Sequence, residues 1–159
     1  MSKSTDSLSK AVGLALAVRL GESLHAIPIA AIEEVLPALP IEPVPHAPPF
    51  ILGVVFVRGH LIPVVDAGER LGVPRKRPLE PPIVCVYCNQ RLFGIEVDEA
   101  LDLIDLDGAA VLSAEQAGAA AGFFAGVIDY QGEVIRLLDP EQLLGAEEKT
   151  QLQAIESHA

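Results

Sequence analysis

Short apolar runs separated by turn signals fill most of the chain. Residues 14–20 (LALAVRL) and 83–88 (IVCVYC) are rich in aliphatic residues, and each is followed by a turn and a second apolar run, HAIPI or LFGIEV. Two further pairs of runs meet at Arg58-Gly59 and at Gln131-Gly132. Paired short runs of this kind are typical of β-hairpins, and the glycine accepts the positive φ of a tight turn. The pattern predicts Arg58 and Gln131 at equivalent hairpin tips.

The same signals occur twice, in the same order. The segment GVVFVRGHLIPVVDAGERLG from Gly53 aligns with GVIDYQGEVIRLLDPEQLLG from Gly126, 73 positions later. An earlier block, LALAVRLGESLHAIPIAAIEEVL, resembles PIVCVYCNQRLFGIEVDEALDLI with an offset of 68, as Leu24 and Leu92 show. The two offsets differ because one connection is longer in the second copy, and surface loops tolerate such a difference in length. The chain is therefore predicted to contain two copies of one unit.

The repeat predicts an all-β fold made of two related lobes of about five short strands, each lobe a small barrel that hides its own edges. We expect one domain over residues 11–146, with lobe one at about 14–72, a linker at 73–82 and lobe two at about 83–146. Residues 1–10 are expected to be a disordered tail, and residues 147–159 a polar tail or helix. Neither lobe can bury much core alone, so the two should pack together.

Two breaks interrupt the strands. Residues 37–49 (PALPIEPVPHAPP) hold six of the thirteen prolines, which predicts an extended surface loop. The linker concentrates positive charge in Arg75, Lys76 and Arg77. Such a run is either a solvated linker or a basic docking patch.

The aspartates shared by the two copies, Asp66 and Asp139, favour helix capping over acid–base chemistry. Glu69 and Gln142 stand three positions after them, as in a reciprocal capping box, and proline follows Asp139 directly. Two short helices are predicted, each closing its copy at Gly72 or at Gly145.

Charge and composition narrow the choice of function. The chain has 22 acidic and 11 basic residues, a net charge of −11. This balance disfavours nucleic acid and anionic membranes as partners. No apolar stretch is long enough to span a bilayer, so no direct membrane insertion is expected. The segment AVGLALA after Lys3 and Lys10 has features of a secretory signal, but the repeat favours a buried strand there. With two cysteines, a cytoplasmic location is the simplest expectation.

Nothing in the sequence predicts an active site, a metal site or a cofactor. Cys85 and Cys88 have a Cys-x-x-Cys spacing, but they stand in a predicted strand and lack two further zinc ligands. Residues three apart on a strand point to opposite faces, which favours buried cysteines over a redox pair. The histidines are scattered, and His60 beside the turn is an ordinary strand-end residue or a surface contact.

The run PPFILGVVFVRGHLIPVVDAGERLG, with IAAIEEVL and the proline-rich spacer before it and GVIDYQGEVIRLLDPEQLL near the end, resembles the CheW-type coupling proteins. The resemblance extends from about Leu14 to Gly145. It implies two intertwined five-stranded SH3-like β-barrels and no enzymatic activity. It also implies two partners inside bacterial cells, the regulatory domain of a CheA-type histidine kinase and the cytoplasmic tip of a methyl-accepting chemoreceptor.

By the same resemblance, the turn of Arg58 and Gly59 corresponds to the family's receptor contact, and Glu34 with Val35 to a second partner-sensitive segment. We add Phe56 and His60, which flank the turn, to the candidate partner-binding residues. A guanidinium on a rigid turn can orient a partner through two hydrogen bonds.

The chain departs from the family pattern at two places. Phe56 stands where an asparagine is usual, and Ala67-Gly68 stands where Leu-Arg usually follows the aspartate. These departures suggest an altered partner surface, such as that of a secondary chemosensory array controlling twitching by type IV pili. The other hypotheses are a redox or metal protein using Cys85 and Cys88, and a domain binding a small ligand between the lobes, for which the sequence offers no positive signal.

Overall fold

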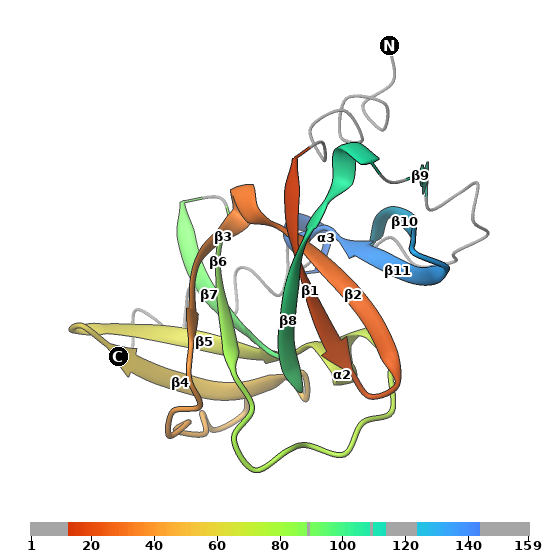
Figure 1. Cartoon of the computed structure of the whole chain (residues 1–159). Coiled ribbons are helices and arrows are strands. Elements are labelled where there is room, and N and C mark those ends of the chain that lie inside the picture. The colour runs from red at the N-terminus through yellow and green to blue at the C-terminus, as the bar shows by residue number, and fades with distance from the viewer. Residues whose placement is uncertain (1–12, 89, 109, 114–123, 144–159) are drawn as a thin grey trace.

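The computed structural model describes residues 13–88, 90–108, 110–113 and 124–143 (Figure 1). The predictions for residues 1–10 and 147–159 and for a helix end at Gly145 lie outside this part of the chain. Within it, the strands in chain order are β1 (Leu14–Leu20), β2 (Ser23–Pro28), β3 (Ile32–Leu36), β4 (Ile51–Val57), β5 (His60–Asp66), β6 (Ile83–Cys88), β7 (Arg91–Glu96), β8 (Glu99–Asp105), β9 (Ala110–Ser113), β10 (Phe124–Tyr130) and β11 (Glu133–Leu138).

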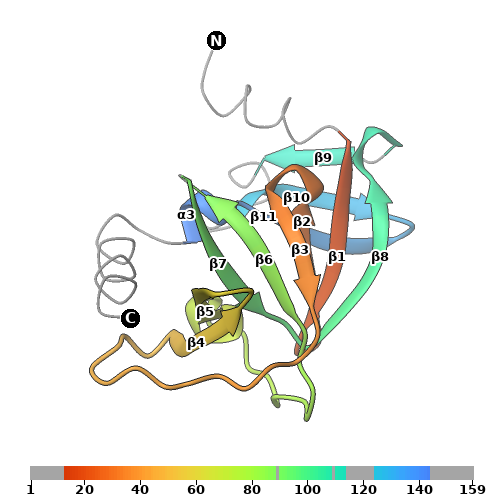
Figure 2. The same cartoon turned by 90° about the vertical axis from the view of Figure 1, so that its left-hand side faces the viewer.

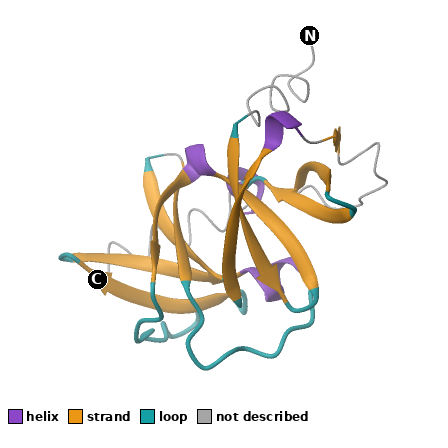
Figure 3. Ribbon diagram, viewed as in Figure 1, coloured by secondary structure: helices purple, strands orange, loops and turns teal. Residues whose placement is uncertain are grey.

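Helical structure in the described chain is limited to single turns at strand ends, shown in purple in Figure 3. These turns are η1 (Ile29–Ala31), α2 (Ala67–Leu71), η2 (Leu106–Gly108) and α3 (Pro140–Leu143). No helix in the described residues is long and apolar enough to cross a membrane. The predicted all-β class is confirmed.

The strands form two sheets that exchange strands between the repeats. One sheet has the order β8-β1-β2-β11-β10-β9, and the other has the order β3-β6-β7-β5-β4. The first hairpin of each copy therefore lies in the sheet built mainly by the other copy, and Figure 2 shows β1 beside β8 and β3 beside β6. The short strand β9 gives the first sheet its sixth member. The prediction of two intertwined barrels is confirmed.

The strand register confirms the internal repeat. In the parallel ladder of β11 with β2, Leu137 pairs with Ala26. In the parallel ladder of β5 with β7, Val64 pairs with Gly94. Leu137 stands 73 positions after Val64, and Gly94 stands 68 positions after Ala26, so the two pairs are equivalent under the offsets of the sequence repeat. Equivalent residues thus occupy equivalent positions in the two sheets.

Aliphatic side chains fill three cores. One lies inside the five-stranded sheet and includes Val55, Ile62 and Cys85. A second belongs to the six-stranded sheet, and the largest combines residues of β1 and β2 with residues of β6 and β7. Because this largest core takes residues from both sheets, apolar packing holds the two barrels together.

The hairpin turns have the predicted geometry. Arg58 and Gly59 have φ values of 48° and 83°, and the equivalent Gln131 and Gly132 have 52° and 82°. Positive φ at both central residues defines the type I′ turn, whose twist matches that of its strands. The two hairpin tips are therefore equivalent and rigid.

The proline-rich segment is an extended loop, as predicted, and it covers the edge of β4. Glu42 and Val54 exchange backbone hydrogen bonds of 2.9 Å in both directions. Gly53 makes this approach possible, since a Cβ there would lie 2.1 Å from the Glu42 carbonyl oxygen. The loop thereby protects an edge that would otherwise be open to pairing with another chain.

The two shared aspartates cap helices, as predicted. Asp66 accepts a hydrogen bond from the Glu69 amide at 3.2 Å, and Asp139 accepts one from the Glu141 amide at 3.0 Å. The reciprocal half of the predicted capping box is absent at Asp66, because its own amide donates to the Phe50 carbonyl at 2.7 Å. Gly72 ends α2 in the left-handed conformation, with φ of 70°.

Candidate functional site

Arg58 is presented at the tip of the hairpin of β4 and β5, which projects to the left in Figure 1. The type I′ turn fixes its backbone, and its side chain remains 68% exposed. An exposed charged side chain on a rigid turn loses little backbone entropy when a partner binds. The geometry thus suits recognition of another protein.

Glu34 pairs with this arginine. The Arg58 Nη2 atom donates to the Glu34 Oε1 atom, and the Glu34 side chain is 30% exposed. Glu34 lies on β3, at the opposite edge of the five-stranded sheet from β4. The edge strands β3 and β4 are not paired by backbone hydrogen bonds, so the ion pair of Arg58 with Glu34 connects the two edges of the sheet through side chains. The sequence predicted both residues but gave no signal that they would bond to each other.

Phe56 lies on the outer surface of the same hairpin. It pairs across the strands with the half-buried Leu61, while its neighbours Val55 and Val57 point into the core. Phe56 is 69% exposed, which is unusual for so large an apolar side chain. An exposed aromatic of this kind can anchor a partner by burial in an apolar pocket.

The other predicted contact residues are also exposed, Gly59 and His60 at the same hairpin tip and Val35 on β3. Val35 lies on β3 beside Glu34, but alternation along the strand places it on the other face. His60 and Gly59 complete the hairpin tip, and a Cβ at Gly59 would meet nothing within 4 Å. The structure brings Arg58 and Glu34 into contact and leaves Phe56 and Val35 on outer faces of two edge strands.

The two cysteines are buried in different cores. Cys85 belongs to the core inside the five-stranded sheet, and Cys88 to the core shared by both sheets. Burial raises the pKa of the Cys85 thiol, an effect opposed by the positive charge of Arg58. A buried thiol with a raised pKa is a poor nucleophile and a poor metal ligand. Among the described residues, no group of three or more His, Cys, Asp or Glu could hold a metal ion.

The interpretations of the basic linker as solvated or as a docking patch were wrong for Arg75, whose side chain is only 5% exposed, whereas Lys76 is exposed and the Arg77 side chain is 51% exposed. Both guanidinium groups bind Glu96, which is fully buried. Sequence reasoning missed this cluster because its carboxylates come from segments far apart in the chain. The only signal in the sequence was Glu96, an acidic residue inside the apolar run LFGIEV.

Fold and site together define a double-barrel β protein with an exposed arginine turn and an exposed aromatic side chain on one hairpin. The family model of the CheW-like domain matches residues 14–148. The chain belongs to the CheW-like domain family.

Individual relatives agree with this assignment. The chain is 28% identical over 137 residues to the chemotaxis protein CheW of Rhizobium meliloti (strain 1021), covering 84% of this chain and 88% of the relative. It is 32% identical over 135 residues to protein FrzA of Myxococcus xanthus, covering 79% and 81%. The crystal structure of the scaffolding protein TtCheW from Thermoanaerobacter tengcongensis has the same fold, with a TM-score of 0.76, 22% identity, and coverage of 86% and 90%.

Proposed function

We propose that this chain is a non-enzymatic coupling protein that joins the cytoplasmic tip of a chemoreceptor to the regulatory domain of a CheA-type histidine kinase inside the cell. Membership of the CheW-like family supports this proposal, as do relatives named as chemotaxis proteins and a scaffolding protein of the same fold. The observation that carries it is Arg58, exposed at a rigid hairpin tip and already paired with a carboxylate.

Arg58 binds the receptor in this proposal. Its pair with Glu34 uses one terminal nitrogen, whereas a guanidinium carries five N–H donors. The remaining donors can bind a receptor carboxylate, or the carbonyl groups at the end of a receptor helix, while Glu34 keeps the side chain oriented. A lysine offers no such planar fork.

The test is co-purification of the protein with the CheA-type kinases and receptor tips of its own host. Arg58→Ala should weaken receptor binding by roughly 1–3 kcal/mol, because it removes a charge-assisted hydrogen bond, and should leave kinase binding unchanged. Gln131→Ala is the matched control, since it changes the equivalent tip of the other copy. Isothermal titration calorimetry with each purified partner gives the two affinities.

Two results would contradict the receptor role of Arg58. Equal losses of receptor affinity in Arg58→Ala and Gln131→Ala would show that the arginine turn has no special role. Binding of the unaltered protein to neither partner would show that the scaffold serves other proteins.

A second candidate is a coupling protein of a secondary chemosensory array, such as one that controls twitching by type IV pili. Phe56 favours it, because a side chain 69% exposed replaces the family's usual asparagine on the surface next to Arg58. An aromatic at that point requires an apolar residue or pocket in the partner, which a receptor matched to asparagine does not need.

Phe56→Asn distinguishes the two candidates. If Phe56 selects a specialised receptor, the substitution should reduce affinity for that receptor by about 1–2 kcal/mol through lost apolar burial and should favour receptors of the host's other arrays. Competition binding with a panel of the host's receptor tips measures this shift. Unchanged preference would remove the support for the second candidate.

A further inference from the structure

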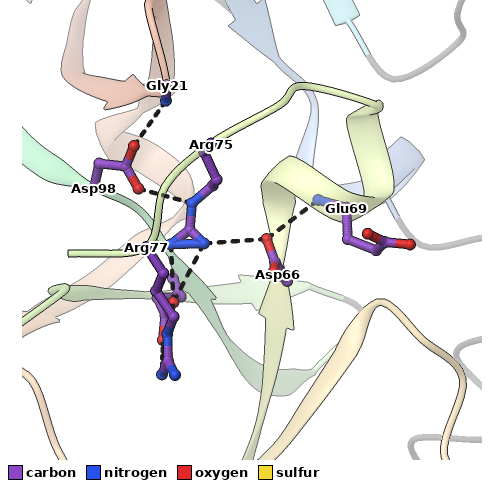
Figure 4. Close-up of polar contacts among 7 residues, drawn as sticks. Gly21, Asp66, Glu69, Arg75, Arg77 and Asp98 are labelled. Carbon is purple, nitrogen blue, oxygen red and sulfur yellow. Dashed lines mark hydrogen bonds and ion pairs between the residues drawn. The ribbon is translucent and has the colours of Figure 1, made fainter. Parts of the chain in front are cut away.

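Residues 73–77 form a short segment that we call the strap. It leaves α2 after Gly72 and passes between the turn of β1 and β2 and the ends of β5 and β7, as Figure 4 shows. The two elements that it passes belong to different sheets. The strap therefore lies at a junction between the two barrels.

Arg75 is the centre of the contacts made by the strap. Its Nε donates to Asp98 Oδ1 at 2.7 Å, its Nη2 to Glu96 Oε1 at 2.9 Å, and its Nη1 to Asp66 Oδ1 at 3.3 Å. Arg77 adds two hydrogen bonds of 2.7 Å to the two carboxylate oxygens of Glu96. The Arg75 side chain is only 5% exposed. A buried guanidinium with three carboxylate partners has one allowed orientation.

These contacts reach both sheets. Asp66 and Glu96 are neighbours in register at the ends of β5 and β7, in the five-stranded sheet. Asp98 stands in the turn that leads from β7 into β8 of the six-stranded sheet, and its Oδ2 accepts a hydrogen bond of 2.7 Å from the Gly21 amide. Gly21 lies in the turn between β1 and β2, so a chain of hydrogen bonds runs through Arg75 from one barrel to the other.

Two glycines make room for the strap. A Cβ at Gly68 would lie 2.6 Å from the Arg75 Cδ atom, and a Cβ at Gly21 would lie 2.3 Å from the Pro74 carbonyl oxygen. In the other copy, Glu141 takes the place of Gly68, while Pro28 takes that of Glu96. The buried carboxylate and the glycine are thus absent from the equivalent positions of the other copy.

We propose that Arg75 is a positioning residue that fixes the orientation of one barrel relative to the other, and that Gly68 is the position that admits it. Apolar packing between the barrels is non-directional and holds them together without setting their angle. The planar guanidinium group of Arg75, bound to three carboxylates, sets this angle. The value of a fixed angle rests on the proposed function, because a protein that holds two partners must also hold them in a fixed relation.

The experiment measures the barrel orientation itself and uses no partner, so its result is independent of the coupling function. Spin labels at Tyr87→Cys and Asp102→Cys report on the five-stranded and six-stranded sheets, while Cys85 and Cys88 are buried from the reagent. The unaltered strap should give one narrow distance distribution by pulsed electron paramagnetic resonance. Arg75→Ala should broaden it, and Lys76→Ala, an exposed change in the same strap, should leave it narrow.

The double variant Gly68→Arg with Arg75→Ala tests the second half of the proposal. An arginine side chain at position 68 points into the space that Arg75 leaves, so the distribution should become narrow again. Gly68→Arg alone should melt at a lower temperature than the double variant, because two guanidinium groups then compete for one space. A double variant no narrower than Arg75→Ala would overturn the role of Gly68.

A lower melting temperature of Arg75→Ala does not by itself support positioning, since any buried ion pair contributes to stability. A narrow, unshifted distribution in that variant would overturn the proposal whatever its melting temperature. If Arg75→Ala does not fold, Arg75→Lys takes its place, because it keeps the charge and loses the fork. Arg75→Lys should also broaden the distribution, and an unchanged width would overturn the proposal equally.

Discussion

His25 is a buried titratable residue in β2. Its side chain has no exposed surface, and it lies opposite Arg136 of β11 in the parallel ladder. Burial, together with the positive charge of Arg136, lowers its pKa from 6.5 to about 4. The folded protein therefore holds a neutral imidazole at the point where the first and last hairpins of the described chain meet.

This histidine should make stability depend on pH. Above pH 6.5 the imidazole is neutral in both the folded and the unfolded chain, and its contribution is constant. Between pH 6.5 and about 4 the unfolded chain binds a proton that the folded chain excludes, so the free energy of unfolding falls as the pH falls. The full shift corresponds to a loss of about 3 kcal/mol, of which about 2 kcal/mol should be lost by pH 5.0, and urea unfolding at pH 7.5, 6.0 and 5.0 measures this part.

His25→Leu is the control for this prediction. It removes the titrating group, so the variant should lose less stability than the unaltered protein between pH 7.5 and 5.0. Carboxylates that are paired in the fold weaken both proteins at acid pH, and the difference between the two slopes isolates His25. Parallel slopes would contradict the assignment.

The elements of the fold depend on a few close backbone approaches. Gly53 lies under the proline-rich loop, with φ of 150°, and a Cβ there would clash with the Glu42 carbonyl. Gly59 has φ of 83° in an open hairpin tip, where a Cβ would touch nothing. An alanine at Gly59 therefore adds backbone strain alone, whereas an alanine at Gly53 also displaces a neighbouring segment.

Gly53→Ala should destabilise the protein more than Gly59→Ala does. The turn variant should lose about 1 kcal/mol from strain alone. The Gly53 variant should lose about 1–3 kcal/mol more, because its methyl group separates the loop from β4 and breaks the two backbone hydrogen bonds of Glu42. Chemical denaturation gives the stabilities, and faster hydrogen exchange at the Val54 amide should appear in Gly53→Ala only. Equal losses would show that the loop contact is not stabilising.

Local elements were predictable where a short-range signal decides them. The Arg58-Gly59 turn, the Asp66 cap and the left-handed Gly72 follow from neighbouring residues, and the structure has all three. The pair of Arg58 with Glu34 and the cluster around Arg75 were not predictable in the same way. Their partners come from segments far apart in the chain, and only the folded sheets bring them together.

At the scale of the whole molecule, the exchange of hairpins between the repeats makes the two barrels inseparable. Residue spacing alone predicted two lobes, whereas the resemblance to the CheW-type proteins predicted that they intertwine. The spacing could not decide this, because swapped and unswapped repeats have the same alternation of apolar residues. The register of β2 with β11 decides it.

Separate expression of residues 1–78 and 79–159 should therefore yield two unfolded or insoluble fragments. Each sheet of the intact chain contains strands from both fragments, so neither fragment alone can complete a sheet or bury its core. Co-expression should restore a folded complex with the circular dichroism spectrum of the intact chain. Either fragment giving a cooperative thermal transition alone would contradict the inseparability of the barrels.

The strand exchange also determines when folding can begin. The hairpin of β1 and β2 leaves the ribosome first, but its neighbour β11 is among the last strands to be made. The early hairpin, with its apolar run LALAVRL, must wait without its final partner while most of the chain is synthesised. Long-range pairing of this kind slows folding and leaves apolar edges open to aggregation. Synthesis of this protein should therefore depend on chaperones that hold nascent chains.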